Sequence, residues 1–355
     1  MKPSLRSSTL KNALKRVLAP VFLGLGYYHA RLGALRDRAL VVMYHRVTGQ
    51  TPSARKRDDP VDTGISAVHF EAQIRYLRER MNPLPLDDLV DRIRRSKPLP
   101  ARAVAVTFDD GYEDTYTVAS PILKRYGVPA TVFVVAGFLD SPDIFWWEKV
   151  PELLTIARRP SCLDTIPLRA LSPAAERLPR RLPLSSPRER ARAAAALIEF
   201  IKDLPSALVS EALWTLEDQL DVTTDAIDGS RHRVMTAVQL HALATDGVAV
   251  GAHTLTHPNL RTIDHQEEII REIRSCKRIL EDVTQKPVTG FAYPYGFPKH
   301  YTQAARQEVI EAGFLFACTA RPGVLALTSD PYEMPRISAP SAPLPLLLWQ
   351  LSKQA

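Results

Sequence analysis

The stretch AVAVTFDDGY, residues 103–112, joins an unbroken run of small and apolar residues to two adjacent carboxylates, Asp109 and Asp110. A second stretch, VAVGAHTLTH at residues 248–257, has the same design, with His253 and His257 after the apolar run. Short apolar runs bounded by turn residues predict buried strands. Because active sites of α/β proteins collect at the carboxyl ends of strands, we expect these four side chains to meet.

One aspartate and two histidines form a three-ligand site for a divalent metal that leaves a position open for water. The other aspartate is then free to act as a base, which predicts a hydrolase. Taken alone, Asp109-Asp110-Gly111 is also a common turn, and two loop histidines are often satisfied by ordinary hydrogen bonds. The placement of both sets after strands favours the catalytic interpretation.

Outward from these stretches, apolar runs predict further strands, and helical periodicity or capping signals predict helices between them. The other predicted strands are Leu40–Tyr44, Ala130–Val135, Val288–Tyr293, Phe314–Cys318 and one ending at Arg336. The predicted helices of the core include Thr115–Tyr126, Thr236–Thr245, Asp264–Thr284 and Lys299–Ala312. Strands that alternate with helices imply a parallel sheet, and about seven strands favour a closed or nearly closed barrel.

The composition changes between about residues 141 and 234, where Arg, Ala, Leu and Pro dominate. Helices are predicted there at Pro187–Leu204 and Ser206–Leu220. We interpret 141–234 as a helical insertion in a barrel of residues 36–355, preceded by a separate N-terminal segment of residues 1–35.

The N-terminal segment alternates basic residues with Leu10, Leu14, Leu18 and Val21 at helical spacing. This pattern favours a basic amphipathic helix on an anionic membrane surface. A helix packed on the outer wall of the barrel and an export signal are the alternatives. The apolar run is too short to span a bilayer, which needs about 20 residues.

The three cysteines, Cys162, Cys276 and Cys318, suggest isolated thiols in a reducing compartment. We therefore expect a cytoplasmic or peripheral membrane protein. The formal charge of +7 permits contact with anionic lipid or an acidic glycan. We expect no nucleic-acid partner, because no basic run is interleaved with aromatic residues.

Three stretches together resemble the motifs of the polysaccharide deacetylases, which have the NodB-type fold of carbohydrate esterase family 4. They are Thr107–Tyr112, Gly251–Leu260 and Phe291–Gly296. The resemblance covers roughly residues 41–136 and 235–337. It implies an α/β fold, a distorted (β/α)₇ barrel with the helical insertion, that removes N-acetyl groups from an N-acetylated glycan in surface polysaccharide synthesis.

The resemblance also implies roles for individual residues. Asp110, His253 and His257 would hold a divalent ion, preferably zinc, with cobalt, nickel or manganese as alternatives. Asp109 would be the general base, and the backbone N–H of Tyr295 would stabilise the oxyanion.

Two departures from the family pattern direct attention to two further residues. The third motif has Ala292 where the family has an arginine that pairs with the base, and the C-terminal Leu-x-His motif is absent. In Met43-Tyr44-His45-Arg46 we find a likeness to the variants with an N-terminal Tyr-His motif, so His45 is the expected general acid. Arg336 is the expected replacement for the missing arginine. The alternatives are a polar residue that caps a strand for His45 and a surface residue for Arg336.

The aromatic pair Trp146-Trp147 opens the insertion. It fits either stacking on sugar rings or, slightly better, a hydrophobic anchor for the helices of the insertion. Two other functions remain open: a deacetylase of a different amide or of an O-acetyl ester, and a carbohydrate-binding barrel with impaired catalysis.

Overall fold

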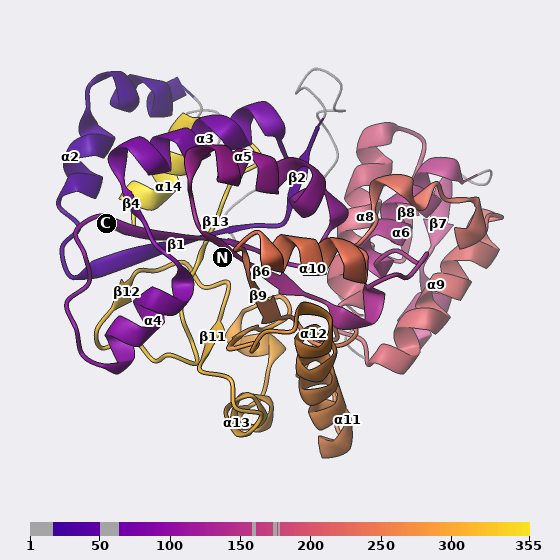
Figure 1. Cartoon of the computed structure of the whole chain (residues 1–355). Helices are drawn as coiled ribbons and strands as arrows, with labels where there is room; N and C mark the ends of the chain where they lie inside the picture. The colour runs from indigo at the N-terminus through magenta and orange to yellow at the C-terminus, as the bar shows by residue number, and fades with distance from the viewer. Residues whose placement is uncertain (1–16, 50–63, 158–160, 173–175, 177) are drawn as a thin grey trace.

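The computed structural model describes residues 17–49, 64–157, 161–172, 176 and 178–355. Its centre is a nine-stranded sheet that curls strongly into half a barrel, with helices packed around it (Figure 1). The path of the sheet runs through β11 (Phe316–Cys318), β10 (Gly290–Ala292), β9 (Ala249–Ala252), β6 (Ala130–Val134), β5 (Ala103–Phe108), β1 (Arg38–Tyr44) and β12 (Leu325–Ala326). Off this path, β4 (Asn82–Pro83) pairs with β5, and β13 (Ile337–Ser338) pairs with β1.

The predicted α/β barrel fold is confirmed, and the sheet is mixed rather than fully parallel. All strand pairs along the path are parallel except β1 with β12, which is antiparallel. Residues 334–338 run between β11 and β1 and so connect the two sides of the curled sheet. Met334 bridges to Cys318 in β11, and Ile337 and Ser338 pair with Val42 and Met43 in β1. These residues form the seam of the half-barrel. The strand predicted to end at Arg336 is shifted, because β13 begins one residue later, at Ile337, and contains only two residues.

The strands are buried on both faces, as expected for strands covered by helices on one side and by a barrel interior on the other. In β1, Leu40 and Val42 face the large core under the helices, whereas Ala39 and Val41 face the interior. The interior face is rich in alanine, also in β5, and small side chains allow the sheet to curl tightly. The helix α4 (Leu86–Arg94) plugs this interior with Leu86, Leu89, Val90 and Ile93.

The outer helices follow the predicted order, with two interruptions. Thr115–Ala119 forms the π-helical turn η2 before α5 (Ser120–Tyr126), and the predicted helix 264–284 is divided by the π-helical turn η7 (Arg271–Ser275). The remaining outer helices are α3 (Ala67–Arg80), α10 (Ala237–Thr245), α11 (Gln266–Ile270), α12 (Cys276–Thr284), α13 (Gln303–Glu311) and α14 (Leu344–Ser352). Two short strands, β2 (Arg46–Thr48) and β3 (Gly64–Ser66), form a separate parallel pair.

A group of helices lies at one end of the molecule in Figure 1 and surrounds a hydrophobic core of its own. It consists of α6 (Trp146–Ile156), α7 (Ile166–Ala170), α8 (Pro187–Ile201), α9 (Ser206–Leu220) and the antiparallel pair β7 (Cys162–Asp164) and β8 (Arg181–Pro183). Ser186 and Glu189 form a capping box at the start of α8, which explains where that helix begins.

Part of the N-terminal segment packs against the barrel. Residues 17–24 are helical, α2 (Tyr27–Gly33) follows, and α2 contacts α14. Tyr28, Leu32 and Leu35 are buried there. Lys2, Arg6 and the other basic residues before residue 17 lie outside the described residues. None of the described helices is long and apolar enough to cross a membrane.

Candidate metal centre and active site

The two aspartates follow β5, where a tight turn separates their carboxylates. The Asp109 N–H donates to the Tyr44 carbonyl of β1 at 2.9 Å, which keeps the chain in register just beyond the strand. Asp110 and Gly111 both have positive φ, 72° and 82°. A Cβ on Gly111 would lie 2.9 Å from a Val134 methyl, so the turn depends on glycine there. Both carboxylates are buried.

The two histidines lie on the loop that follows β9. The His253 N–H donates to the Val134 carbonyl at 2.9 Å, which extends the pairing of β9 with β6. Thr254 and His257 have φ of 65° and 62°, and the His257 N–H donates to the Thr254 hydroxyl oxygen at 3.0 Å. The neighbouring Thr256 donates to both oxygens of the buried Glu272, with N–H and O–H bonds of 2.8 Å each. These bonds hold the loop so that both imidazoles return to the end of β5.

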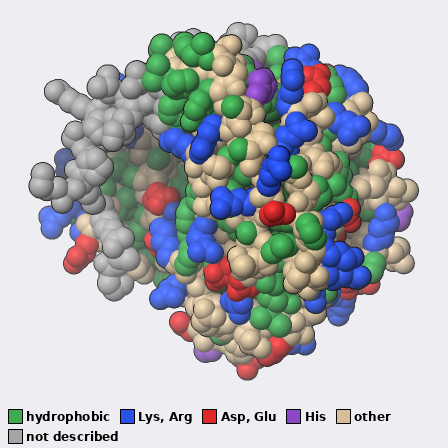
Figure 2. Space-filling view, turned by 90° about the vertical axis from the view of Figure 1, so that its left-hand side faces the viewer, with side chains coloured by type: hydrophobic (Ala, Val, Ile, Leu, Met, Phe, Trp, Pro, Cys, Tyr) green, Lys and Arg blue, Asp and Glu red, His purple; other side chains and the backbone are tan. Residues whose placement is uncertain are grey.

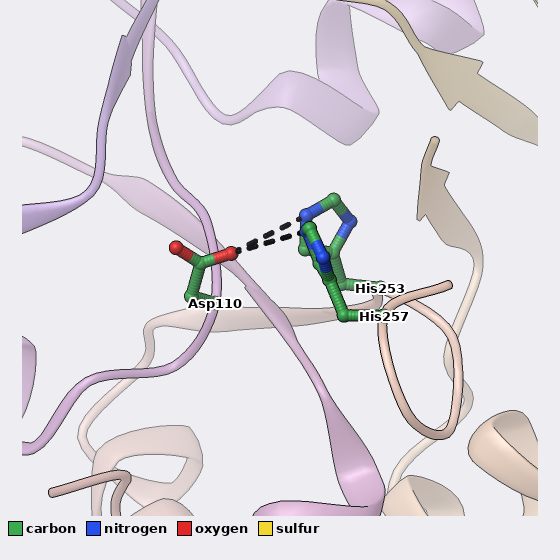
Figure 3. A group of neighbouring side chains, drawn as sticks. All are labelled: Asp110, His253 and His257. Carbon is green, nitrogen blue, oxygen red and sulfur yellow. Dashed lines mark ion pairs between the residues drawn. The ribbon is translucent and has the colours of Figure 1, made fainter. Parts of the chain in front are cut away.

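Asp110, His253 and His257 come together as a compact, buried cluster whose ligand atoms all lie within 4.8 Å of one another (Figure 3). The Asp110 Oδ1 atom lies 3.5 Å from His253 Nε2 and 3.6 Å from His257 Nε2. Zinc–ligand bonds of about 2.0–2.1 Å imply ligand–ligand separations of about 3.3 Å in a tetrahedral site. The observed spacing therefore fits a metal ion of this size.

Hydrogen bonding and burial prepare both imidazoles as ligands. His253 Nδ1–H donates to the Ala292 carbonyl at 2.7 Å, which leaves Nε2 with its lone pair directed at the cluster. Burial, followed by the charge on His253, lowers the pKa of His257 to about 3, so this ring is neutral at neutral pH. Burial alone would raise the pKa of Asp110, but the His253 hydrogen bond and nearby histidine charges lower it to about 2.

Asp109 is paired with Arg336 rather than with the histidines. Arg336 Nη1 and Nη2 donate to the two Asp109 carboxylate oxygens at 2.6 and 2.7 Å, a bidentate pair. Arg336 is 1% exposed, and its Nε–H donates to the Thr319 carbonyl at 2.9 Å. Burial opposes the ionised form of Asp109, but Arg336 outweighs it and holds the pKa of this carboxyl below its usual value. The arginine therefore lies in the barrel seam and not at the surface.

His45 follows the last residue of β1 and is half-buried. The parallel register of β1 with β5 pairs Tyr44 with Phe108, so His45 follows β1 at the level where Asp109 follows β5. The strand register therefore brings His45 to the same end of the sheet as Asp109, although about 200 residues separate it from the histidines of the β9 loop.

Tyr295 lies beside His257, on the turn that follows β10. Its ring is 4.8 Å from the His257 ring in an edge-to-face arrangement, and its φ is 60°. The next residue, Gly296, packs so tightly that a Cβ there would lie 2.4 Å from the Ala320 nitrogen. Two consecutive residues with positive φ thus form the turn that brings Tyr295 to the cluster.

The two tryptophans of the insertion have different surroundings. Trp147 stacks on Phe145 at 4.4 Å, contacts His257 with ring centroids 4.5 Å apart, and donates to the Tyr112 hydroxyl at 3.1 Å. Tyr112 in turn donates to Glu148 at 2.7 Å. Sequence reasoning missed this support of His257, although Tyr112 lies in the first motif and Glu148 follows the two tryptophans.

Trp146 instead lines a cavity of about 160 Å³ beside His257 and Tyr295. Lys202, Ser206 and Ser210, from the end of α8 through α9, line the same cavity. The helical group thus forms one wall of the space next to the candidate metal centre.

Together these features define an α/β protein with a candidate metal centre and a separately held, ionised aspartate, an arrangement suited to hydrolysis. A family model described as polysaccharide deacetylase matches residues 96–159 and 203–317, just over half of the chain. The chain belongs to the polysaccharide deacetylase family, whose members are hydrolases of carbon–nitrogen bonds other than peptide bonds.

Curated relatives match over shorter stretches. The poly-beta-1,6-N-acetyl-D-glucosamine N-deacetylase of Escherichia coli (strain K12) is 36% identical over 89 residues, 24% of this chain and 13% of the relative. The enzyme of the same name from Staphylococcus aureus (strain N315) is 38% identical over 80 residues, 22% of this chain and 27% of the relative. The matched stretch therefore spans less than a third of either relative.

Solved structures match over most of the chain and support the fold alone. The Streptococcus pyogenes deacetylase PplD, in complex with acetate, has a TM-score of 0.56 at 17% identity and covers 89% of this chain and 98% of its own. IcaB from Ammonifex degensii has a TM-score of 0.55 at 18% identity and covers 90% of this chain and 98% of its own.

Proposed function

We propose that this protein removes N-acetyl groups from an N-acetylated polysaccharide, oligosaccharide or glycan precursor in surface polysaccharide synthesis. The observation that carries the proposal is the buried cluster of Asp110, His253 and His257 beside the Asp109–Arg336 pair. Two relatives named as N-deacetylases of poly-N-acetylglucosamine support the class of substrate.

Asp110, His253 and His257 would hold a divalent ion, with zinc preferred and cobalt, nickel or manganese as alternatives. Such an ion, when bound, would lower the pKa of a water molecule and polarise the acetamide carbonyl. Asp109 would accept the proton of the attacking water. Arg336 would position that carboxylate and keep it ionised, since the bidentate pair fixes the plane of the Asp109 carboxylate.

We assign the two remaining steps to His45 and Tyr295. His45 would donate a proton to the departing amine, because it follows β1 at the sheet end where Asp109 follows β5. The backbone N–H of Tyr295 would stabilise the oxyanion of the tetrahedral intermediate, since this residue lies at the turn next to His257. This assignment would place the chain among the variants of the family that have an N-terminal Tyr-His motif.

The proposed activity is tested by acetate release from a panel of N-acetylated oligosaccharides, with O-acetylated sugars and a simple acetamide alongside. We expect release from the N-acetylated glycans, loss of release with a chelator, and recovery on addition of Zn²⁺, Co²⁺, Ni²⁺ or Mn²⁺. Release from the O-acetylated sugars alone would establish an esterase instead. Metal binding with glycan binding but no release from any compound would establish a carbohydrate-binding barrel with impaired catalysis.

We also propose a peripheral contact with an anionic membrane surface through residues 17–27. Val17, Val21 and Leu25 recur every four residues and are 67%, 52% and 75% exposed. Figure 2 shows the face that carries this segment, with Lys and Arg side chains spread widely over it. An exposed apolar stripe in a basic surface suits the boundary between lipid headgroups and acyl chains.

A further inference from the structure

The outer part of α9 borders a groove of about 620 Å³ that shares no residue with the cavity beside His257. Its wall includes Trp214, Glu217 and Asp218 of α9, and Ile156 and Val222 add apolar surface. Trp214 is 66% exposed, an unusual state for a tryptophan, because burying this side chain is strongly favourable. An exposed aromatic in a groove indicates a surface on which a flat, partly apolar ligand can stack.

The groove is also negatively charged in a protein of the opposite charge. Residues 203–230 contain seven aspartates and glutamates and no lysine or arginine, whereas the whole chain has a formal charge of +7. No basic side chain is among the described residues that line the groove. A cationic ligand is therefore favoured there over a neutral or anionic one.

A row of neighbouring side chains on α9 leads from the cavity beside His257 to this groove. Ser206 and Ser210 line the cavity beside His257, and Trp214 and Asp218 follow at the four-residue spacing that aligns side chains on a helix. The rise of an α-helix places Asp218 about 12 Å along the axis from Ser210. A glycan that leaves the cavity along α9 would reach the groove within the length of a short oligosaccharide.

We propose that the groove around Trp214 binds glycan units that already carry free amino groups. This proposal rests on the proposed function, because removal of an acetyl group converts a neutral amide of the glycan into an amine. Amines of this kind are largely protonated near neutral pH, as the pKa of about 7.7–8.0 for an α-amino group illustrates. The apolar face of the sugar ring stacks on Trp214, and its ammonium group pairs with Asp218.

Glu217 has a different task in the same groove. Its Oε1 atom accepts the Thr224 N–H at 2.5 Å, which ties the segment after α9 to the helix. Asp218 has an exposed side chain, so it is the carboxylate that we assign to the ligand. The consequence is that the protein retains a partly deacetylated chain, which makes an extended glycan its substrate rather than a single sugar.

The test measures binding of a β-linked glucosamine hexamer and of its fully N-acetylated counterpart by isothermal titration calorimetry. The metal-loaded full chain carries the substitution Asp109→Asn so that the acetylated hexamer is not consumed. We expect the glucosamine hexamer to bind with an affinity that falls as salt rises. Trp214→Ala should weaken it roughly tenfold, as for a central aromatic contact, and Asp218→Asn roughly threefold, as for an exposed ion pair.

Matched variants separate the groove from general effects. Trp214→Phe should keep most of the affinity because it keeps an aromatic face, and Glu267→Gln removes an equal charge from exposed α11 and should change nothing. Unaltered binding by both Trp214→Ala and Asp218→Asn would overturn the proposal, as would equal sensitivity of the acetylated hexamer to Asp218→Asn. Acetate release is measured separately on the unsubstituted protein. Absence of acetate release with an intact groove would refute the proposed function alone.

Discussion

Asp109 and Asp110 are neighbours in the chain, yet their carboxylates have different partners. Asp110 faces two imidazole nitrogens, whereas Asp109 is held by both terminal nitrogens of Arg336. The turn with positive φ at Asp110 is what directs them apart. This separation of environments allows one carboxylate to bind a metal while the other stays available for proton transfer.

The metal ligands can be tested one by one. Asp110→Ala, His253→Ala and His257→Ala should each reduce zinc content strongly and abolish acetate release, because three ligands hold the ion and two hold it poorly. Metal content is measured by atomic emission after dialysis, with circular dichroism as a check on folding. Full metal occupancy in any one variant would remove that residue from the site.

Asp109→Asn should lose turnover but keep its metal, unlike the substitutions of the three metal ligands. The amide keeps the shape of the side chain but cannot accept a proton, so turnover should fall by about 10²–10⁴-fold while metal content is retained. Turnover and zinc content are measured on the same preparation. If this variant kept its activity and lost its metal, the roles of the two aspartates would have to be exchanged.

His45 is the residue whose assignment depends most on the fold. His45→Ala should lower turnover by about 10²–10⁴-fold and leave metal content unchanged, because the ring is proposed to donate a proton and not to bind the ion. His265→Ala, on an exposed residue that precedes α11, is the control and should behave like the unsubstituted protein. Near-normal turnover of the His45 variant would make His300 the next residue to test as the acid, since it is buried and its ring lies 5.3 Å from that of Tyr295.

At the level of elements, α6 connects the helical group to the barrel through a buried ionic network. His232 contacts Glu148 at 2.9 Å and Glu152 at 3.1 Å, and Arg46 of β2 pairs with Asp114 at 3.0 Å and approaches Glu148 at 3.8 Å. Because Glu148 also accepts from Tyr112, this network reaches the first motif. The position of Trp147 against His257 therefore depends on how firmly α6 is anchored.

This anchor should be sensitive to pH. The two glutamates outweigh the effect of burial and raise the pKa of His232 to about 9. A group with a raised folded-state pKa stabilises the fold fully below its unfolded pKa of about 6.5, and this contribution disappears as pH rises through 9. We expect His232→Gln to cost up to about 3 kcal/mol of unfolding free energy at pH 6 and little at pH 10. Urea unfolding at both pH values measures the difference; equal costs would show that the histidine is not charged in the fold.

For the whole molecule, the membrane contact is best tested by substitutions of exposed residues and not by deletion of the N-terminal segment. Removing residues 1–35 would uncover the surfaces that Tyr28, Leu32 and Leu35 bury, so loss of the whole segment would confuse unfolding with release. Val21→Asp with Leu25→Asp alters only exposed positions. We expect this double variant to bind vesicles of anionic phospholipid at least tenfold more weakly in sedimentation, with Val238→Asp, an exposed valine of α10, as the control. Equal binding by both variants would exclude residues 17–27 as the contact.

Much of the fold was accessible from local patterns. The strand Ala103–Phe108 and the helix Ser206–Leu220 have the predicted bounds, because each is delimited by strong local signals at both ends. The predicted strand Val288–Tyr293 was too long, since only Gly290–Ala292 pairs with its neighbours. The antiparallel strand β12 was missed, because two residues contain no measurable periodicity.

The sequence by itself determined the family, the order of strands and helices, and the motifs that supply Asp109, Asp110, His253 and His257. These are local properties, since each motif directly follows a strand whose hydrophobic run is continuous. Only the tertiary structure decided that the Arg336 guanidinium pairs with the Asp109 carboxylate. This pair joins residues 227 positions apart across the seam of the sheet. The contact of Trp147 with His257 and the path along α9 from the cavity to Trp214 are decided in the same way. They arise from the packing of a helical group on a half-barrel, which no short stretch of sequence specifies.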